Sequence, residues 1–319
     1  MVDKDQKLKS LVRSLPIKHI LLNPETNSVY YTSGTHLHLK TPQSSIENKL
    51  HDRLNLHGIV RHSSYEHASN DFIITYGGNI VFCVDPVNLS VVLKIELDPR
   101  IWIKNVLPLE NSTNCTNKLI ILTFFNEIFI YEIKFNNDRR TRTATFITKI
   151  QSSNKFILYS SALQIDPTNS NILEILAGSV FNFINYWRID LSRNEKLEKE
   201  TIFEGHKGAI FGIEFLDNFS TKKSNNHYHG QKLFISTSDD RSIRIFNRQS
   251  NQELAQLYGH TARVWRAKFI KTKDDKSLII SCAEDQLVIV WDVEDLDDVR
   301  ILSKFTAHFG RNVWDLFLG

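Results

Sequence analysis

Two stretches of the chain decide its fold: GHTARVWRAKF at 259–269 and SCAEDQLVIVWD at 281–292. An earlier pair, GHKGAIFGIEF at 205–215 and LFISTSDDRSIRIFN at 233–247, repeats the same features in the same order. Each pair has a Gly-His dipeptide, a strand-like run, a Ser and an Asp four residues apart, and an aromatic residue near its end. A recurring order of this kind indicates a structural repeat of short strands.

The rest of the chain is also dominated by short strand signals. Apolar and β-branched runs, punctuated mostly by Gly, Asn, Asp or Pro, lie at 72–78, 79–85, 89–95, 101–107, 118–125 and 127–133. An aromatic residue near the end of the third strand of each group recurs at intervals of about 45 to 59 residues, at Phe82, Tyr131, Trp187, Phe246 and Trp291. Four strands per unit at this period predict an all-β fold, a β-propeller of six to seven blades.

Counting strands leaves the closure of the propeller open. We expect three strands over 17–40, four blades over about 55–257, a fifth blade over about 263–305, and one further strand over 311–317. A propeller must close because an open blade edge invites aggregation. Either the strand at 311–317 completes a mixed blade with the N-terminal strands, or the chain is the N-terminal part of a longer protein with several propellers. We favour the second alternative, with 1–319 as one domain whose clearest repeats lie at 172–319.

Composition and charge fit a globular protein without a strong electrostatic bias. Hydrophobic residues make up 41% and charged residues 24% of the 319 residues, and the formal net charge is only +3. The charge balance therefore does not demand a nucleic-acid partner. No run has the length of a signal peptide or a membrane span, and the three cysteines are widely spaced, so we expect reduced thiols, no membrane and a cytoplasmic location.

The two pairs of stretches resemble consecutive WD repeats. In that family a His, a Ser or Thr, an Asp and a Trp form a hydrogen-bonded relay that ties the loop between blades to the blade. The resemblance assigns this structural relay to His260, Ser281, Asp285 and Trp291, and in the earlier copy to His206, Ser236 and Asp240. Phe246 stands at the Trp position of the earlier copy, so we expect that relay to lack one bond. AHFGRNVWDLFLG at 307–319 begins a third copy with Ala307 in place of Gly.

A His, a Ser and an Asp also invite a catalytic interpretation. A nucleophilic Ser needs an exposed turn between a strand and a helix, or a nearby oxyanion hole. Ser236 and Ser281 instead fall in the middle of predicted strands of a packed sheet. We therefore interpret these residues as structural and expect no catalytic residues.

A more specific resemblance covers about 172–319. AGSVFNFINYWRID at 177–190, the two Gly-His copies and HFGRNVWDL at 308–316 are similar to the N-terminal propeller of the large WD-repeat subunit that accompanies an FtsJ-type tRNA 2′-O-ribose methyltransferase. The Ala-Arg-Val-Trp-Arg and Gly-Arg-x-x-Trp elements exceed the general WD pattern. Before 172 the match rests on strand order rather than on motifs.

The resemblance implies an accessory subunit rather than an enzyme. Members of that family bind the methyltransferase and help position tRNA, so that the ribose of wobble nucleotide 34 is methylated from S-adenosylmethionine. The chain has no Gly-rich loop between a strand and a helix for that cofactor, and no Lys-Asp-Lys-Glu set, so we expect no cofactor on this chain. The alternative is a general WD-repeat scaffold in protein sorting or ubiquitin transfer, while an enzyme would need catalytic groups that the sequence does not offer.

Several basic and aromatic residues do not belong to the WD architecture. If the first strand of each blade lines the channel, its first residues emerge at the face that carries the Gly-His loops. Convergent Arg and Trp side chains suit phosphate contact with base stacking, or a protein hot spot. The candidates for partner or RNA contact are Lys207, Arg241, Arg263, Trp265, Arg266, Arg311 and Trp314. The alternative is that the arginines are merely solvated and that the two tryptophans pack against an adjacent blade.

Two other clusters carry less weight. His51, His57, His62 and His67 share no face of a strand or helix and lack a Cys or carboxylate to complete a metal site, so we expect no metal. NNDRRTRT at 136–143 gathers three arginines, and we interpret it as a solvated hairpin tip rather than a phosphate contact.

Overall fold

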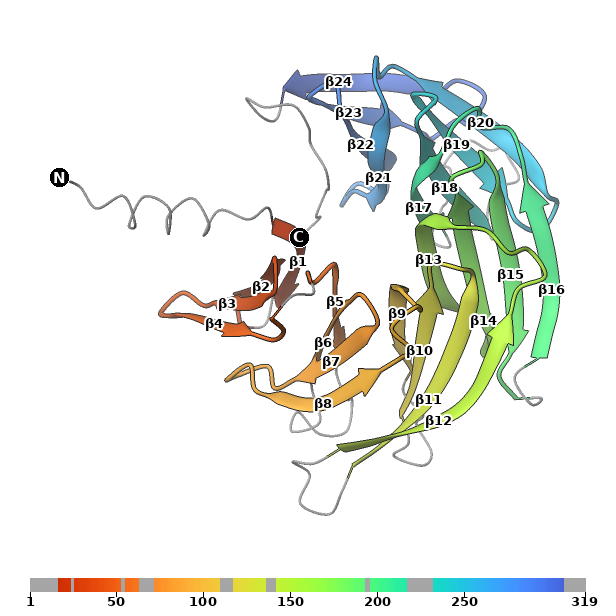
Figure 1. The fold of residues 1–319 in the computed structure, drawn as a ribbon. Coiled ribbons are helices and arrows are strands. Elements are labelled where there is room, and N and C mark those ends of the chain that lie inside the picture. Colours follow the sequence, from red (N-terminus) through yellow and green to blue (C-terminus); the bar gives the residue numbers. More distant parts are fainter. Residues whose placement is uncertain are drawn as a thin grey trace. The chain divides into compact units, whose positions relative to one another are not determined.

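The computed structural model describes residues 17–23, 26–52, 55–62, 72–109, 117–135, 142–192, 196–216 and 232–306. These residues form six four-stranded antiparallel sheets, each with its strands in sequence order, and contain no helix (Figure 1). The expected all-β fold is confirmed: each sheet is one blade of a WD-repeat β-propeller.

The first three blades lie in the N-terminal half. Blade 1 consists of β1 (Ile17–Asn23), β2 (Ser28–Ser33), β3 (His36–Lys40) and β4 (Ser45–Lys49). Blade 2 consists of β5 (Gly58–His62), β6 (Phe72–Gly77), β7 (Ile80–Val84) and β8 (Val91–Glu96). Blade 3 consists of β9 (Ile103–Leu109), β10 (Asn117–Thr123), β11 (Glu127–Phe135) and β12 (Arg142–Gln151).

The other three blades carry the motifs of the sequence. Blade 4 consists of β13 (Leu158–Asp166), β14 (Asn169–Ser179), β15 (Ile184–Asp190) and β16 (Lys196–Phe203). Blade 5 consists of β17 (Ile210–Leu216), β18 (Leu233–Ser238), β19 (Ser242–Asn247) and β20 (Gln252–Tyr258). Blade 6 consists of β21 (Val264–Lys271), β22 (Ser277–Ala283), β23 (Leu287–Asp292) and β24 (Arg300–Thr306).

The expectation of only three N-terminal strands is wrong, because Ser45–Lys49 pairs with β3 as a fourth strand. Its sequence SIENK has one apolar residue, and all five positions are at least partly exposed. An outer strand with both faces near solvent shows no hydrophobic alternation, so sequence reasoning could not find it. The strand expected at 311–317 lies outside the described residues.

Burial falls from the inner to the outer strands and explains why the inner strands were easy to recognise. Every residue of β18 and β19 is buried, whereas every residue of β24 is exposed. Strands buried on both faces read as continuous apolar runs. The repeating aromatics fall on the third strands of blades 2 to 6, at Phe82, Tyr131, Trp187, Phe246 and Trp291.

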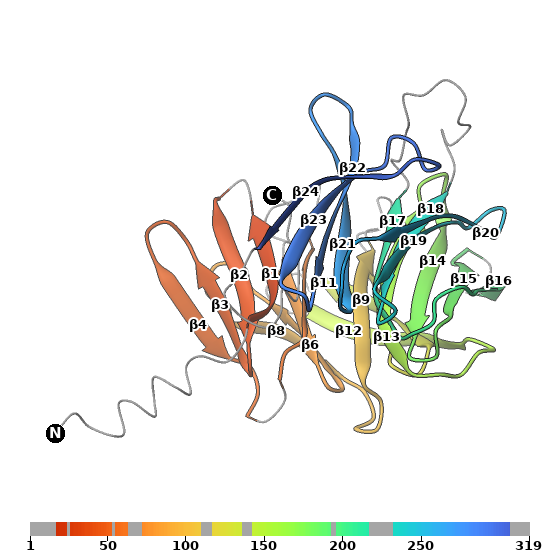
Figure 2. The same cartoon turned by 90° about the horizontal axis from the view of Figure 1, so that it is seen from above.

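The described residues divide into two compact units. One holds blades 1 and 2 with most of blade 3; the other holds the turn Phe124–Glu127, the end of β12 from Ile150, and blades 4 to 6. Within the second unit, β17 lies beside both β13 and β21 (Figures 1 and 2). Buried apolar side chains fill the space between blades 5 and 6, where Leu233 and Ile245 pack in one cluster with Val264 and Ile289. Each of these two blades is therefore stabilised by the face of the other.

Candidate functional site

The structure brings the four relay residues of blade 6 into one hydrogen-bonded chain. Trp291 Nε1 donates to Ser281 Oγ at 2.8 Å, and Ser281 Oγ lies 2.8 Å from His260 Nε2. His260 Nδ1 lies 3.0 and 3.1 Å from the carboxylate oxygens of Asp285. Asp285 also accepts the backbone N–H groups of Thr261 and Leu287. The chain links β23, β22, the Gly-His loop and the turn between β22 and β23.

The direction of this relay follows from the protonation of His260. Burial lowers the pKa of His260 below its usual value, although Asp285 opposes the shift, so the imidazole is neutral near pH 7. A neutral imidazole has one N–H, and a carboxylate can only accept. The proton therefore lies on Nδ1 and is donated to Asp285, while Nε2 accepts from the hydroxyl of Ser281. The same hydroxyl oxygen then accepts from Trp291, so all these polar groups are satisfied.

Blade 5 has the same arrangement with one substitution. His206 Nε2 lies 2.8 Å from Ser236 Oγ, and His206 Nδ1 lies 2.9 Å from Asp240 Oδ2. Phe246 offers no donor to Ser236, but Ser242 Oγ donates to Asp240 Oδ1 at 2.6 Å and lies 3.2 Å from His206 Nδ1. Burial opposes ionisation of Asp240, yet the hydrogen bonds from His206 and Ser242 hold its pKa well below the usual value. The hydroxyl of Ser242, which has no equivalent at Leu287 of blade 6, thus adds a hydrogen bond at the Asp240 end of this relay.

The relay hydroxyls are inaccessible. Ser236 and Ser281 are fully buried, and each hydroxyl is held by the imidazole beside it. A nucleophile must reach its substrate, and neither oxygen does. The geometry of these residues serves to hold the loop between blades against the sheet.

Arg263 sits at the Gly-His loop end of blade 6, where its charge is balanced from within the chain. Its Nε lies 3.0 Å from Asp239 Oδ1 of the turn between β18 and β19, and 3.1 Å from Glu284 Oε2 of the turn between β22 and β23. Its guanidinium also lies over the ring of Trp265, 5.8 Å from the centroid. The exposed Arg263 therefore joins the turns of blades 5 and 6 through two carboxylates.

Trp265 and Arg266 contact the neighbouring blade. The pairing of β21 with β22 shifts between Val264 and Arg266, which places Trp265 at a bulge. The Trp265 ring lies 4.7 Å from the ring of Phe211 of blade 5, and Arg266 Nη1 donates to the carbonyl of Phe211 at 2.7 Å. Both side chains are only partly exposed. Both side chains therefore pack against the adjacent blade, which is the alternative that the sequence left open for Trp265.

Lys207 and Arg241 lie at the same end of blade 5. The backbone N–H of Lys207 donates to Asp240, and Arg241 follows Asp240 in the turn with a left-handed backbone (φ 69°). Both residues are exposed. Lys207 and Arg241 of blade 5 and Arg263 of blade 6 are thus each exposed at a loop end of their blade, while Arg311 and Trp314 lie outside the described residues.

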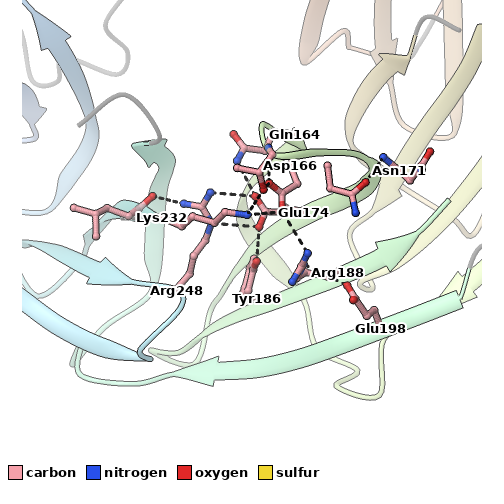
Figure 3. A network of polar contacts seen from close by, with 12 residues as sticks. Gln164, Asp166, Asn171, Glu174, Tyr186, Arg188, Glu198, Lys232 and Arg248 are labelled. Atoms are coloured by element: carbon pink, nitrogen blue, oxygen red, sulfur yellow. Dashed lines mark hydrogen bonds and ion pairs between the residues drawn. The ribbon is translucent and has the colours of Figure 1, made fainter. Parts of the chain in front are cut away.

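A polar network that sequence reasoning missed joins blades 4 and 5 (Figure 3). Glu174 of β14 is fully buried and pairs with the fully buried Arg248, with Nη2 to Oε2 at 3.1 Å. Tyr186 and Gln164 donate to the same carboxylate at 2.5 and 2.9 Å, and Arg248 also donates to the carbonyl of Leu233. Burial alone would raise the pKa of Glu174, but Arg248 and these donors lower it. In the sequence, the one indication of this network was the single Glu inside the apolar run NILEILAG, which suggests a buried charge that needs a partner.

At the edge of this network, the buried Asp166 is paired with more exposed cations. Asp166 of β13 is contacted by Lys232 and Arg188, and Arg188 also reaches Glu198 (Figure 3). Burial opposes ionisation, but hydrogen bonds from Lys232 and Thr168 lower the pKa of Asp166 to about 2. Because its cations and carboxylates pair with one another, we interpret the network as a structural contact that stabilises the packing of blades 4 and 5, not as a catalytic site.

No group of three or more His, Cys, Asp and Glu side chains among the described residues could hold a metal ion. Of the four clustered histidines, His57 Nε2 lies 2.7 Å from the carbonyl of Ile103, while His67 and the side chain of His62 lie outside what the structure describes. Most of the arginine-rich segment 136–143 is likewise outside it. No helix in the described part of the chain has the length and apolar character needed to cross a membrane.

Comparison with known proteins agrees with the geometry of the relay. The family model "WD domain, G-beta repeat" matches residues 197–247 and 251–292, which include both Gly-His loops and both relay aspartates. The two matched ranges are WD repeats. Outside them the propeller assignment rests on the four-stranded blades of the structure.

Curated relatives give the WD-repeat chain a more specific context. It is 29% identical over 150 residues to the human "tRNA (34-2′-O)-methyltransferase regulator WDR6", covering 44% of this chain and 12% of the relative. The Drosophila melanogaster protein of the same name is 26% identical over 243 residues, covering 70% of this chain and 22% of the relative. The mouse "DDB1- and CUL4-associated factor 6" is 34% identical over 117 residues, covering 36% of this chain and 12% of the relative. The chain therefore matches less than a quarter of the length of each of these proteins.

Proposed function

We propose that this WD-repeat protein is a non-catalytic regulatory subunit of a tRNA methyltransferase. In this role it binds an FtsJ-type 2′-O-ribose methyltransferase and helps position tRNA for methylation of wobble nucleotide 34. The observation that carries the proposal is its homology to the methyltransferase regulators of human and fly. Because the match covers only part of those relatives, their partner and substrate are extended to this chain as part of the proposal.

The geometry of the described residues supports a binding role. The relay hydroxyls are buried, and the polar groups of the relays and of the Glu174 network bind one another, so these groups stabilise blades. Lys207, Arg241 and Arg263 form the exposed basic group at the loop ends of blades 5 and 6. We propose these three as partner or tRNA contacts, together with Arg311 and Trp314. The ring of Trp265 lies against the Arg263 guanidinium, and Arg266 binds the carbonyl of Phe211. S-adenosylmethionine would be bound by the methyltransferase, and the complex would act in the cytoplasm.

Deletion of the gene tests the proposed function directly. Mass spectrometry of nucleosides from purified tRNA should show loss of the 2′-O-methyl group at nucleotide 34, and re-expression of the full chain should restore it. Tagged full chain should also copurify with the methyltransferase. Normal methylation of nucleotide 34 in the deletion strain would contradict the proposal.

A second candidate function is a general WD-repeat scaffold in protein sorting or ubiquitin transfer. The similarity to DDB1- and CUL4-associated factor 6, the highest identity among the three relatives described above, favours it. Under this alternative, copurification would recover a ubiquitin-ligase or sorting complex without a methyltransferase, and the methylation of nucleotide 34 would be unaffected by deletion.

A further inference from the structure

The turn that supplies the relay aspartate carries a different residue in blades 3 and 4. Asp240 and Asp285 stand two residues after the last residue of β18 and β22, and the next residue has a positive φ in both turns. At the same place in the turns after β10 and β14 stand Phe125 and Phe181, followed by Asn126 (φ 61°) and Asn182 (φ 73°). The backbone of the turn is therefore retained while its inward-facing carboxylate is replaced by an aromatic ring.

These two phenylalanines face solvent. Phe125 is 47% exposed and Phe181 is 61% exposed, whereas Asp240 and Asp285 turn inward to their histidines. Exposed aromatic rings at the tips of two successive turns give up the stabilisation that burial provides. Exposed aromatic side chains at neighbouring turns of this kind fit a role in binding.

Two further apolar side chains adjoin them. Leu158 donates its N–H to the carbonyl of Phe124, and Val180 donates its N–H to the carbonyl of Ile157, so the three segments lie against one another. Ile157 and Tyr159 in the middle segment are each 49% exposed. Phe125, Ile157, Tyr159 and Phe181 together form what we call the aromatic face, and all four belong to the second unit of the chain.

Tyr159 of the aromatic face packs on a row of rings in the first strands of blades 5 and 6, in which Phe211 is buried and Trp265 is partly exposed. Tyr159, Phe211 and Trp265 occupy the same bulge position in β13, β17 and β21, where the pairing with the second strand shifts. The ring of Tyr159 lies 4.8 Å from that of Phe211, edge to face, and Phe211 lies 4.7 Å from Trp265. Arg263 with its carboxylates Asp239 and Glu284 then lies at the far end of this row.

A set of hydrogen bonds holds the aromatic face in place. Blade 4 lacks the His relay, since Asn154, Ala177 and Phe181 stand where blade 6 has His260, Ser281 and Asp285. Instead Glu200 accepts from Asn185 Nδ2 at 2.6 Å and from the N–H of Ser153, and Asn185 Nδ2 also lies 3.0 Å from Ser152 Oγ. Phe156 and Phe183 pack edge to face at 4.7 Å within the same segments. The exposed rings are thus carried by ordered turns, which lowers the entropic cost of binding.

The charges beside the aromatic face favour a protein over RNA as its occupant. RNA binding requires cations that neutralise phosphates, but Arg263 is already balanced by two partly exposed carboxylates. We propose that the aromatic face is the docking surface for the methyltransferase, a protein partner that presents apolar side chains with basic residues at the edge facing Asp239 and Glu284. This inference rests on the proposed function for the identity of the partner. Aromatic anchors beside a polar rim are the usual composition of a protein–protein hot spot.

Binding of the methyltransferase to the full chain tests this inference. The variant Phe125→Ser/Tyr159→Ser/Phe181→Ser should bind more weakly. Its dissociation constant should rise by roughly 100-fold or more, as expected for loss of several hot-spot side chains. The matched control Val87→Ser/Ile147→Ser/Leu302→Ser removes three exposed apolar side chains elsewhere and should bind like the wild type. Because the triple variant can fail to fold, Phe181→Ser is measured alone, with an expected weakening of about tenfold, and Phe181→Tyr should retain binding.

The outcomes separate the two proposals. If the wild-type chain binds the methyltransferase and the folded triple variant, or Phe181→Ser, binds it equally well, the docking inference is overturned. The proposed function is left intact by that result. Retained methyltransferase binding with loss of tRNA binding assigns the aromatic face to RNA and also overturns the inference. If the wild-type chain fails to bind the methyltransferase, the proposed function is wrong and the docking inference falls with it.

Discussion

Glu174 and Arg248 form an ion pair between blades 4 and 5 in which neither side chain is exposed to solvent. Each charge has further partners: Tyr186 and Gln164 donate to Glu174, and Arg248 donates to Leu233 and lies over the ring of Phe215 at 5.0 Å. Two charges can remain buried only when the remaining polar atoms are satisfied in this way. The pair therefore fixes how blades 4 and 5 meet.

Removal of one member of this pair should be costly. Either single change, Glu174→Leu or Arg248→Met, removes one charge of the pair and leaves the other buried, and the free energy of unfolding should fall by about 3–5 kcal/mol. Replacement of both residues, Glu174→Leu with Arg248→Met, should cost much less than the sum of the two single changes because no buried charge is left. Urea denaturation of the four proteins of this double-mutant cycle measures the coupling, and additive effects would show that the pair does not act as a unit.

Asp285→Ala should destabilise blade 6. The change removes the acceptor of the buried Nδ1–H of His260 and of the exposed N–H of Thr261, and an unpaired buried donor costs about 1–3 kcal/mol. Asp239→Ala, one turn away in blade 5, removes an exposed carboxylate and should change stability by less than about 0.5 kcal/mol. Equal losses for both variants in chemical denaturation would contradict a structural role of the relay.

A comparison of Trp291 with Trp187 distinguishes the contribution of the indole hydrogen bond to stability from that of ring packing. Trp291 donates to Ser281, whereas the buried Nε1 of Trp187 has no hydrogen-bond partner among the described residues, because Ala177 stands at the equivalent of Ser281. Both positions lose similar volume in a Trp→Phe change. Trp291→Phe should therefore cost about 1 kcal/mol more than Trp187→Phe, as measured by the difference in their denaturation midpoints. A smaller loss at Trp291 would show that its hydrogen bond does not stabilise the blade.

The relay histidines should make the protein sensitive to mild acid. Burial lowers the pKa of His206 and His260 below the usual 6.5, so the unfolded chain binds more protons than the folded chain below that pH. Stability is thus complete above about pH 6.5 and is lost as the pH falls towards the folded pKa values, with a slope of up to about 1.4 kcal/mol per pH unit for each histidine. Asp240, whose pKa is also lowered, adds a further loss below its usual 3.8. Denaturation between pH 7 and 5 should show a flatter dependence for His206→Asn/His260→Asn, and an unchanged slope would assign the effect to other groups.

Charge reversal at Arg263 tests the basic group without disturbing the core. Arg263→Glu places a third carboxylate beside Asp239 and Glu284, but all three side chains are partly exposed, so stability should change by less than about 1 kcal/mol. Under the proposed function, in which Arg263 is a partner or tRNA contact, binding of the methyltransferase or of tRNA by the complex should weaken, and unchanged binding of both would contradict that assignment. Titration at two salt concentrations checks this, since loss of a phosphate contact also lowers the salt dependence.

The sequence by itself determined the blades and the residues of the relay. A Ser, an Asp four residues later and an aromatic residue ten after the Ser occupy one hairpin, so the local geometry of two paired strands and their turn fixes their positions. The inner strands were equally readable because both of their faces are buried and they are therefore continuously apolar. The outer strand Ser45–Lys49, whose exposed residues lack that pattern, could not be predicted.

Only the tertiary structure decided the partners of charged and aromatic side chains. Arg248 lies 74 residues from Glu174, and Arg263 is balanced by carboxylates from two different turns. No spacing within one blade encodes such contacts, because they depend on how neighbouring blades pack. The exposure of Phe125 and Phe181 was also decided by the structure: they stand at the turn position where Asp240 and Asp285 face inward, yet both rings are exposed. Local spacing fixes what happens within a blade, and packing fixes what happens between blades.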